Sequence, residues 1–140
     1  MKNRFIPLLL ILGISLMGFF GCNLQTKYEE GPFVSIFPAR DRVVNEWEWA
    51  YALEYDVNRT GILADSTIEF LDDGVVKICR ISGECREGTW NLITKRSKLQ
   101  IVFGSKATAY DIFMLKENEM WVRLSENDTF VVEWELVSKN

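Results

Sequence analysis

Hydrophobic and polar residues alternate along most of the chain from residue 46 onward. In residues 46–56, EWEWAYALEYD, large apolar side chains occupy every second position, and acidic residues or alanine stand between them. Successive side chains of a β-strand point to opposite faces, so this pattern predicts a strand with one buried face. The same alternation recurs in later segments, which cover residues 66–71, 75–81, 86–94, 99–103, 108–115, 120–125 and 129–137.

Short turns separate these segments. The DDG at residues 72–74 and the SG at residues 82–83 tolerate the positive φ of tight hairpins. Only residues 57–65 form a longer connection, and no stretch among the strands has helical spacing long enough for a crossover helix. We therefore expect consecutive antiparallel strands, preceded by a short helix whose first turn holds Pro38 and whose end lies near Val43-Val44.

Eight antiparallel strands with one apolar face each can bury those faces by closing into a barrel, which also removes exposed strand edges. Two packed sheets are the alternative. We expect an all-β fold, an eight-stranded antiparallel up-and-down barrel preceded by a short N-terminal helix. If the alternation holds within each strand, the inward side chains are Trp47, Trp49, Tyr51, Leu53, Tyr55, Ile68, Phe70, Val76, Ile78, Trp90, Leu92, Leu99, Ile101, Phe103, Tyr110, Ile112, Met114, Met120, Val122, Leu124, Phe130, Val132, Trp134 and Leu136.

The first 21 residues have a different composition. Lys2 and Arg4 precede an uncharged run at residues 5–21, FIPLLLILGISLMGFFG. This is the layout of a signal peptide; an uncleaved membrane anchor is the alternative, because a spanning helix needs about 20 apolar residues. The FFGC at residues 19–22 resembles the lipobox of lipoprotein signal peptides, which implies that Cys22 becomes the first residue of the mature chain and carries the lipid.

The lipid would attach the protein to a membrane, because two or three acyl chains make attachment stable where one holds it only marginally. Residues 22–32 are mostly polar and lack periodicity, so we expect a tether of roughly 17 to 19 Å, followed by a barrel domain at residues 33–140. The KYEE at residues 27–30 is similar to signals that send some Bacteroidota lipoproteins to the cell surface, or it simply keeps the tether soluble. The expected location is the outer membrane, at its periplasmic face or on the cell surface.

The net charge limits the classes of partner that the protein could bind. Without Lys2 and Arg4, the 16 basic residues fall to 14 against 20 acidic residues, so residues 22–140 carry a formal net charge of −6. Nucleic-acid binding would require a basic stripe and is not expected. At this length, and with 48% hydrophobic residues, the chain has material for one packed domain.

Cys79 and Cys85 flank the turn at residues 82–83. A disulfide between them would persist in an oxidising envelope compartment, provided that the strand register brings their Cβ atoms to about 3.8 Å. We expect this disulfide; two unpaired, packed thiols are the alternative. The chain has no histidine, so a zinc site at these two cysteines is not expected.

Three local sequences carry a family resemblance. The VVNEW at residues 43–47, the GTW at residues 88–90 and the VVEWELV at residues 131–137 make the chain, from about Gly31 onward, similar to the lipocalin-like lipoproteins of Bacteroidota. The resemblance implies an eight-stranded barrel that binds a small hydrophobic ligand. It also implies a basic partner for Trp47 from late in the barrel, which is matched to Arg123.

Barrels of eight strands are either filled by side chains or hold one small ligand. The inward residues of this chain are large and its strands are short, which favours a filled barrel; a small apolar pocket near one open end is the alternative. If a ligand binds, the candidate residues are aromatic side chains at the rim whose hydroxyls or ring edges could orient it, namely Tyr51, Tyr55, Phe70 and Tyr110.

Residues for catalysis are scarce. The chain has no histidine, no glycine-rich phosphate loop and no nucleophile elbow. Every acidic residue is expected on the outer face or in a turn, where its pKa would not be raised for acid catalysis. We expect no enzyme activity, no cofactor and no metal. The expected function is a lipid-anchored envelope lipoprotein that binds a small hydrophobic ligand; the alternative is a structural module that docks an envelope protein partner through an outer patch at Phe113, Trp121 and Val131.

Overall fold

The computed structural model describes Tyr28 and residues 35–127 and 129–139. The expected signal peptide, the lipidation site at Cys22 and all of the tether except Tyr28 lie outside the described residues. The helices are α2 (Ala39–Val43) and α3 (Thr60–Leu63). The strands are β1 (Asn45–Glu54), β2 (Val57–Asn58), β3 (Ser66–Phe70), β4 (Val75–Arg80), β5 (Cys85–Ile93), β6 (Lys98–Phe103), β7 (Lys106–Leu115), β8 (Glu119–Glu126) and β9 (Thr129–Ser138).

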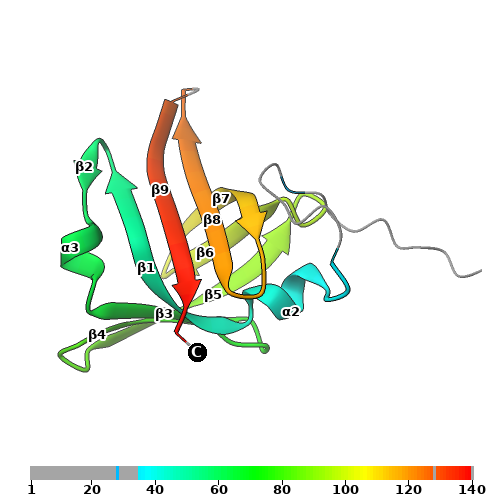
Figure 1. Ribbon diagram of the computed structural model, residues 1–140, viewed down its shortest axis with the longest axis horizontal. Helices are drawn as coiled ribbons and strands as arrows, with labels where there is room; N and C mark the ends of the chain where they lie inside the picture. The colour runs from blue at the N-terminus through cyan, green and yellow to red at the C-terminus, as the bar shows by residue number, and fades with distance from the viewer. Residues whose placement is uncertain (1–27, 29–34, 128, 140) are drawn as a thin grey trace, which may run out of the picture.

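The strands form a closed antiparallel barrel (Figure 1). Each strand from β3 to β9 pairs with the next, β1 pairs with β3, and β9 returns to pair with β1 over a register that runs from Trp47↔Ser138 to Glu54↔Val132. The short β2 only extends β1 as a two-residue hairpin. The barrel therefore has eight strands, and the predicted fold class is confirmed. No helix among the described residues has the length and apolar character needed to cross a bilayer.

One end of the barrel is closed by α2 and Tyr28. Arg42 is 4% exposed; its guanidinium donates a hydrogen bond to the Leu115 carbonyl and lies 5.6 Å from the centre of the Tyr28 ring. The Tyr28 hydroxyl donates to the Arg96 carbonyl at 3.1 Å. Tyr28, which lies within the expected tether, is thus buried against the barrel. We call this the closed end.

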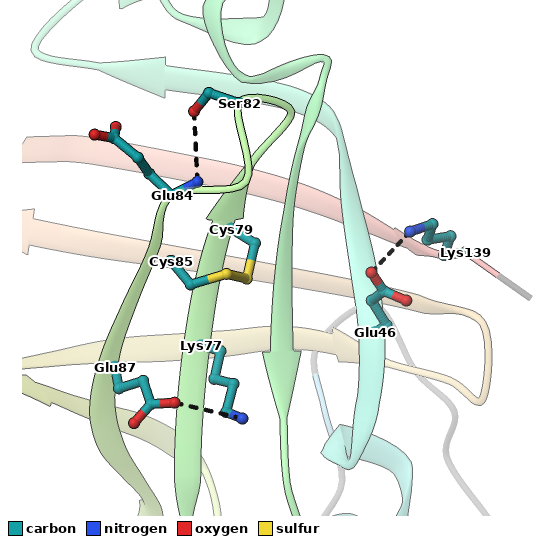
Figure 2. The surroundings of a disulfide bond; sticks show 8 residues. All are labelled: Glu46, Lys77, Cys79, Ser82, Glu84, Cys85, Glu87 and Lys139. Carbon is teal, nitrogen blue, oxygen red and sulfur yellow. Dashed lines mark hydrogen bonds and ion pairs between the residues drawn. A yellow bond between two sulfur atoms is a disulfide. The ribbon is translucent and has the colours of Figure 1, made fainter.

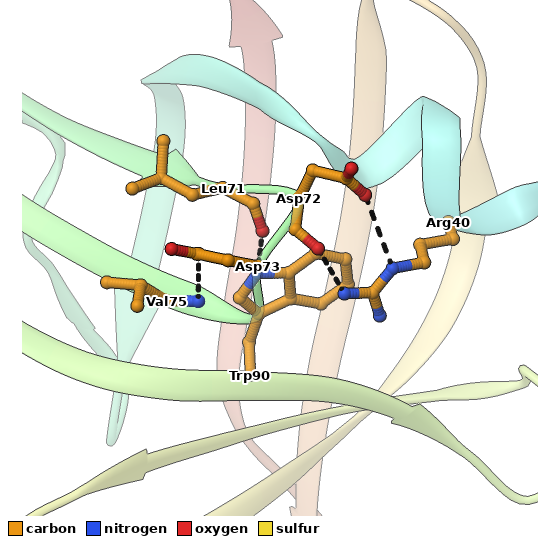
Figure 3. Close-up of polar contacts among 6 residues, drawn as sticks. All are labelled: Arg40, Leu71, Asp72, Asp73, Val75 and Trp90. Carbon is orange, nitrogen blue, oxygen red and sulfur yellow. Dashed lines mark hydrogen bonds and ion pairs between the residues drawn. The ribbon is translucent and has the colours of Figure 1, made fainter.

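Helix α2 is also attached to the β3–β4 turn (Figure 3). The Arg40 side chain donates to the Asp72 carbonyl at 2.7 Å and lies 4.6 Å from the centre of the Trp90 ring. The indole N–H of Trp90 donates to the Leu71 carbonyl at 2.9 Å. These contacts fix the helix across the strand ends. The opposite end, which carries β2, α3 and the β4–β5, β6–β7 and β8–β9 turns, is the open end.

Most of the expected inward side chains form the core. Trp47 is completely buried, and its indole N–H donates to the Val43 carbonyl at 3.0 Å. Half-buried Ile78, Leu92, Phe103 and Leu124 pack against the core. The fully confirmed inward residues are Trp47, Trp49, Ile68, Phe70, Val76, Trp90, Leu99, Ile101, Tyr110, Ile112, Met120, Val122, Val132, Trp134 and Leu136.

A bulge in β1 interrupts the alternation of inward and outward side chains that the sequence predicted. The register with β9 shifts between Trp49 and Tyr51, so Ala52 rather than Tyr51 points inward, opposite Trp134. An extra residue in one strand reverses the parity of everything after it. Tyr51 and Leu53 therefore lie on the outer face, opposite Glu135 and Glu133. Tyr55 leaves the strand with a φ of 48° and is 64% exposed.

The same bulge turns Glu54 inward, because Glu54 lies directly opposite the inward residue Val132. The expectation that every acidic residue lies on the outer face or in a turn is therefore wrong at Glu54. A second bulge lies in β7 between Ile112 and Met114. As a result Leu115, and not Met114 as expected, lies opposite the inward Met120, while Met114 lies opposite Trp121.

The outer face of β7–β9 carries a cluster around Arg123. Its guanidinium lies 4.3 Å from the centre of the Phe113 ring and 5.1 Å from that of Phe130, and its Nε is 3.1 Å from Glu133. Arg123 therefore does not pack on Trp47, which corrects the match that the resemblance implied. Phe130 is 47% exposed rather than inward, since a third bulge shifts the β8–β9 register between Leu124 and Ser125.

A disulfide joins Cys79 of β4 to Cys85 of β5, directly opposite each other in the register (Figure 2). The prediction of this disulfide is confirmed. The next pair along the same face is the ion pair of Lys77 and Glu87, at 3.4 Å. The turn between the cysteines contains Gly83 at a φ of 86°, as the SG sequence predicted. The bond therefore fastens the β4–β5 hairpin at the open end.

We expect Gly88→Ala to lower the free energy of unfolding by about 1–3 kcal/mol. A methyl group at Gly88 would overlap the Val102 carbonyl oxygen and lie 2.7 Å from the Phe103 ring, so β5 and β6 would have to separate. Gly61→Ala in α3 is the matched control, because nothing lies within 4 Å of the added atom; its effect should stay within about 0.5 kcal/mol. Urea unfolding followed by tryptophan fluorescence measures both, and equal stabilities of the two variants would contradict the close packing of β5 on β6.

We expect the disulfide to act locally. Because it closes a loop with a sequence separation of only 6, replacing both cysteines by serine should cost at most about 2 kcal/mol of unfolding free energy. The double variant should still fold, as judged by far-ultraviolet circular dichroism and a cooperative urea transition. An unfolded double variant would show that the barrel depends on this bond.

Candidate ligand site at the open end of the barrel

The open end contains a hollow of about 170 Å³. Its lining comes from the inner faces of β5, β6, β7 and β9 and consists of Arg86, Ile101, Phe103, Lys106, Thr108, Tyr110 and Trp134. A second, wider hollow of about 470 Å³ lies against the β4–β5 hairpin and is lined by Ile78, Arg80, Glu84, Cys85 and Arg86. Arg86 belongs to both hollows, which therefore adjoin each other.

Aromatic rings form the floor of the first hollow. Tyr110 stacks on Trp134 with ring centres 4.8 Å apart, and Trp49 meets Trp134 edge-on at 5.9 Å. Deeper in the barrel, Phe70 packs edge-on against Trp90 at 5.5 Å. Rings in these geometries fill space efficiently. These rings belong to the hydrophobic core, and the first hollow lies beside them at the open end.

The four candidate ligand residues are not brought together. Tyr110 lines the first hollow. Phe70 is 1% exposed and packs against Trp90, whose indole contacts the turn at the closed end, so it is not a rim residue. Tyr51 lies on the outer face after the bulge. Tyr55 is at the rim, but its hydroxyl is 3.4 Å from Glu126 and it lines neither hollow.

Arg86, Lys106 and Thr108 were missed by the sequence analysis, and Phe103 and Trp134 were expected only as core residues. The signal for Arg86 was present in the sequence, because Arg86 shares the parity of Gly88 and the inward Trp90. In the structure Arg86 faces Ile78 across the β4–β5 ladder, and its guanidinium lies 4.4 Å from the centre of the Phe103 ring. The absence of a side chain at Gly88 leaves room for that ring.

Three buried side chains in this region, Tyr110, Trp134 and Trp49, have unusual polar environments. Burial raises the pKa of Tyr110 to about 12, with further increases from the nearby Glu54 and Tyr55. The Tyr110 hydroxyl is therefore protonated at neutral pH. The indole Nε1 atoms of Trp134 and Trp49 are buried and have no hydrogen-bond acceptor among the described residues. Unsatisfied buried donors are uncommon in folded proteins, and that of Trp134 belongs to a residue that lines the hollow.

A third hollow, of about 370 Å³, lies outside the barrel over β1, β3 and β4. Glu46 and Lys139 line it and pair at 2.8 Å, and the hydrogen bond from Lys139 lowers the pKa of Glu46. Glu48, Asp65 and Arg80 also line it, so this hollow is mainly polar. Among the described residues, no group of three or more histidine, cysteine or acidic side chains is placed to hold a metal ion. The open-end hollow is therefore the better candidate site.

Comparison with known proteins supports the fold. No protein-family model and no curated protein matches the chain. A lipocalin-like protein from Bacteroides uniformis ATCC 8492 matches with a TM-score of 0.54 at 8% identity, over 69% of this chain and 98% of that chain. An uncharacterized protein from Bacteroides eggerthii DSM 20697 matches with a TM-score of 0.54 at 10% identity, over 68% of this chain and 98% of that one. The chain therefore has a lipocalin-like barrel fold, as the resemblance in the sequence predicted.

Proposed function

We propose that the protein is a lipid-anchored lipoprotein of the cell envelope, without catalytic activity, whose barrel binds a small hydrophobic ligand at its open end. The observation that carries the proposal is the hollow over Phe103, Tyr110 and Trp134, which adjoins the hydrophobic core of the barrel. Aromatic side chains with few polar groups are the usual lining of small-molecule sites.

The volume of the hollow limits the ligand. A cavity of about 150 Å³ accommodates one benzene molecule, so the hollow of about 170 Å³ fits one aromatic ring or a short alkyl chain. Sites for larger ligands start at about 300 Å³. A longer molecule would have to extend past Arg86 into the adjoining hollow and would remain partly in water.

The anchor and the site would lie at opposite ends of the barrel. Cys22 precedes Tyr28 by six residues, which span at most about 20 Å when fully extended. Because Tyr28 is buried against the closed end, a lipid on Cys22 would hold that end near the bilayer. The open end would then face away from the membrane and receive its ligand from the aqueous side.

A docking module for a protein partner is the second candidate function. The outer patch expected at Phe113, Trp121 and Val131 is half-buried, so it offers little free apolar surface. Exposed apolar side chains lie instead at the rim of the open end, where Ile62 is 70% exposed and Ile81 is 80% exposed. Native mass spectrometry of the gently purified full chain distinguishes the two functions: a co-purifying small molecule supports ligand binding, and a stable complex with a protein partner supports docking.

Benzyl alcohol, a neutral ring-sized probe, should bind the full chain reconstituted in phosphatidylcholine nanodiscs. We expect saturable shifts of the indole N–H resonance of Trp134, and none for Trp47, which lies at the closed end. Thr108→Phe should abolish the shifts by filling the hollow. Thr67→Phe on the outer face is the matched control and should leave them intact. Absent shifts, or shifts unaffected by Thr108→Phe, would refute a ligand site in this hollow.

The anchor is tested separately. Cells that express the full chain should incorporate an alkyne-labelled palmitate analogue into it, and Cys22→Ala should remove the label, because only the thiol of that residue would be modified. Cys79→Ser with Cys85→Ser is the control and should retain the label. A wild-type chain without label, or a labelled Cys22→Ala chain, would contradict lipidation at Cys22.

A further inference from the structure

We propose that the open-end hollow selects a small amphipathic anion, whose carboxylate is held by Arg86 and Lys106 while its ring or short alkyl chain packs on Phe103, Tyr110 and Trp134. This inference rests on the proposed function and specifies the chemical class of the ligand. It follows from four features of the hollow: its two cations, its buried donors, the position of its one nearby inward acid, and its size.

The two cations have no acidic partner among the described residues. Arg86 stacks on Phe103, and the acids on either side of it in sequence are engaged elsewhere, Glu84 with Arg80 at 3.8 Å and Glu87 with Lys77 at 3.4 Å. Lys106 lies directly opposite Phe103 in the β6–β7 register. Both cations line the same hollow. Both cations are exposed at the edge of a hollow with an aromatic floor. In a chain with an excess of acidic residues, two such cations without an acidic partner among the described residues indicate a site for an anionic group.

The remaining polar groups of the hollow can also donate hydrogen bonds. Trp134 lines the hollow with its ring, while its Nε1 is buried and lacks an acceptor among the described residues; the Thr108 hydroxyl lines the hollow and can donate. The Tyr110 hydroxyl is a donor at neutral pH, as tyrosine hydroxyls ordinarily are, and burial raises its pKa further, to about 12. A carboxylate accepts hydrogen bonds and donates none. The lining thus complements an anion better than a neutral donor or a cation.

Glu54 gives the ligand an orientation. It points inward from β1 and is close enough to Tyr110 to raise the pKa of that residue, whereas Arg86 and Lys106 line the hollow from β5 and β7. Glu84, which lines the adjoining hollow, is paired with Arg80, and Glu126 lies beside the Tyr55 hydroxyl. Charge therefore changes sign across the open end, and the carboxylate of a bound ligand should lie on the β5–β7 side, away from Glu54.

Three ring-sized probes of different charge test the selection: benzoate, benzyl alcohol and benzylammonium, titrated into the full chain in nanodiscs of neutral phosphatidylcholine at low salt. The Trp134 indole resonance reports binding. Benzoate should bind about five- to tenfold more tightly than benzyl alcohol, the range expected for charge-assisted hydrogen bonds at a partly exposed site. Benzylammonium should bind most weakly.

Variants assign the effect to particular residues. Arg86→Gln with Lys106→Gln should weaken benzoate binding about five- to tenfold more than benzyl alcohol binding, which removes the advantage of benzoate. The matched control, Lys77→Gln with Lys98→Gln, removes two positive charges that are paired with Glu87 and Asp111, and should preserve the advantage. Glu54→Gln should tighten benzoate binding about two- to threefold, because it removes a repulsive charge.

The outcomes separate this inference from the proposed function. If benzyl alcohol binds and benzoate binds no better, the hollow is a ligand site without charge selection, and the inference fails alone. Preference for benzylammonium would overturn it in the same way. If the control pair abolishes the benzoate advantage as fully as Arg86→Gln with Lys106→Gln, general surface charge is responsible and the inference also fails. If none of the three probes binds, both the inference and the proposed function fail.

Discussion

The structure depends on the pairing of β9 with β1. Without that ladder, the alternating strands would leave two unpaired edges and an apolar face open to water, which is unfavourable both for the backbone groups and for the large side chains of the inner face. With it, Trp47 and Leu136 are almost completely buried and every strand of the barrel has two neighbours. Helix α2, Tyr28 and Arg42 then cover one end. At the other end, α3 packs against the core through Leu63, and the hollow over Tyr110 and Trp134 lies there.

The bulge in β1 connects this closure to the candidate site. By inserting one residue into the ladder with β9, it places the small Ala52 against Trp134 and turns Glu54 toward the interior. An unbroken alternation would have put Tyr51 at that position and filled more of the barrel. The local break in regular pairing thus supplies both an inward charge and less bulk beside the aromatic floor. Such breaks are frequent next to functional sites.

Sequence reasoning located the strands, the short helix and the disulfide because each has a local signal: period-two alternation, Pro38 at a helix start, and two cysteines flanking a turn. It failed where one extra residue changed the parity, at Tyr51, Leu53, Glu54 and Met114, since no residue type marks a bulge in these strands. Phe70 was misplaced for a different reason. The alternation predicts which side chains face inward. It does not predict the end of the barrel at which a side chain lies, because that depends on the register between strands. Arg86 could have been found, because it shares the parity of Trp90.

The central claim is that β1 and β9 close the sheet with a shifted register. Backbone nuclear Overhauser effects on the full chain in nanodiscs measure this directly. The account predicts cross-strand contacts between Glu48 and Val137 before the bulge and between Ala52 and Trp134 after it. Contacts that join Tyr51 to Trp134 would show an unbroken alternation, and the absence of any contact between the two strands would show an open sheet or two packed sheets. The first result would contradict the shifted register and the inward position of Glu54, and the second would contradict the closed barrel itself.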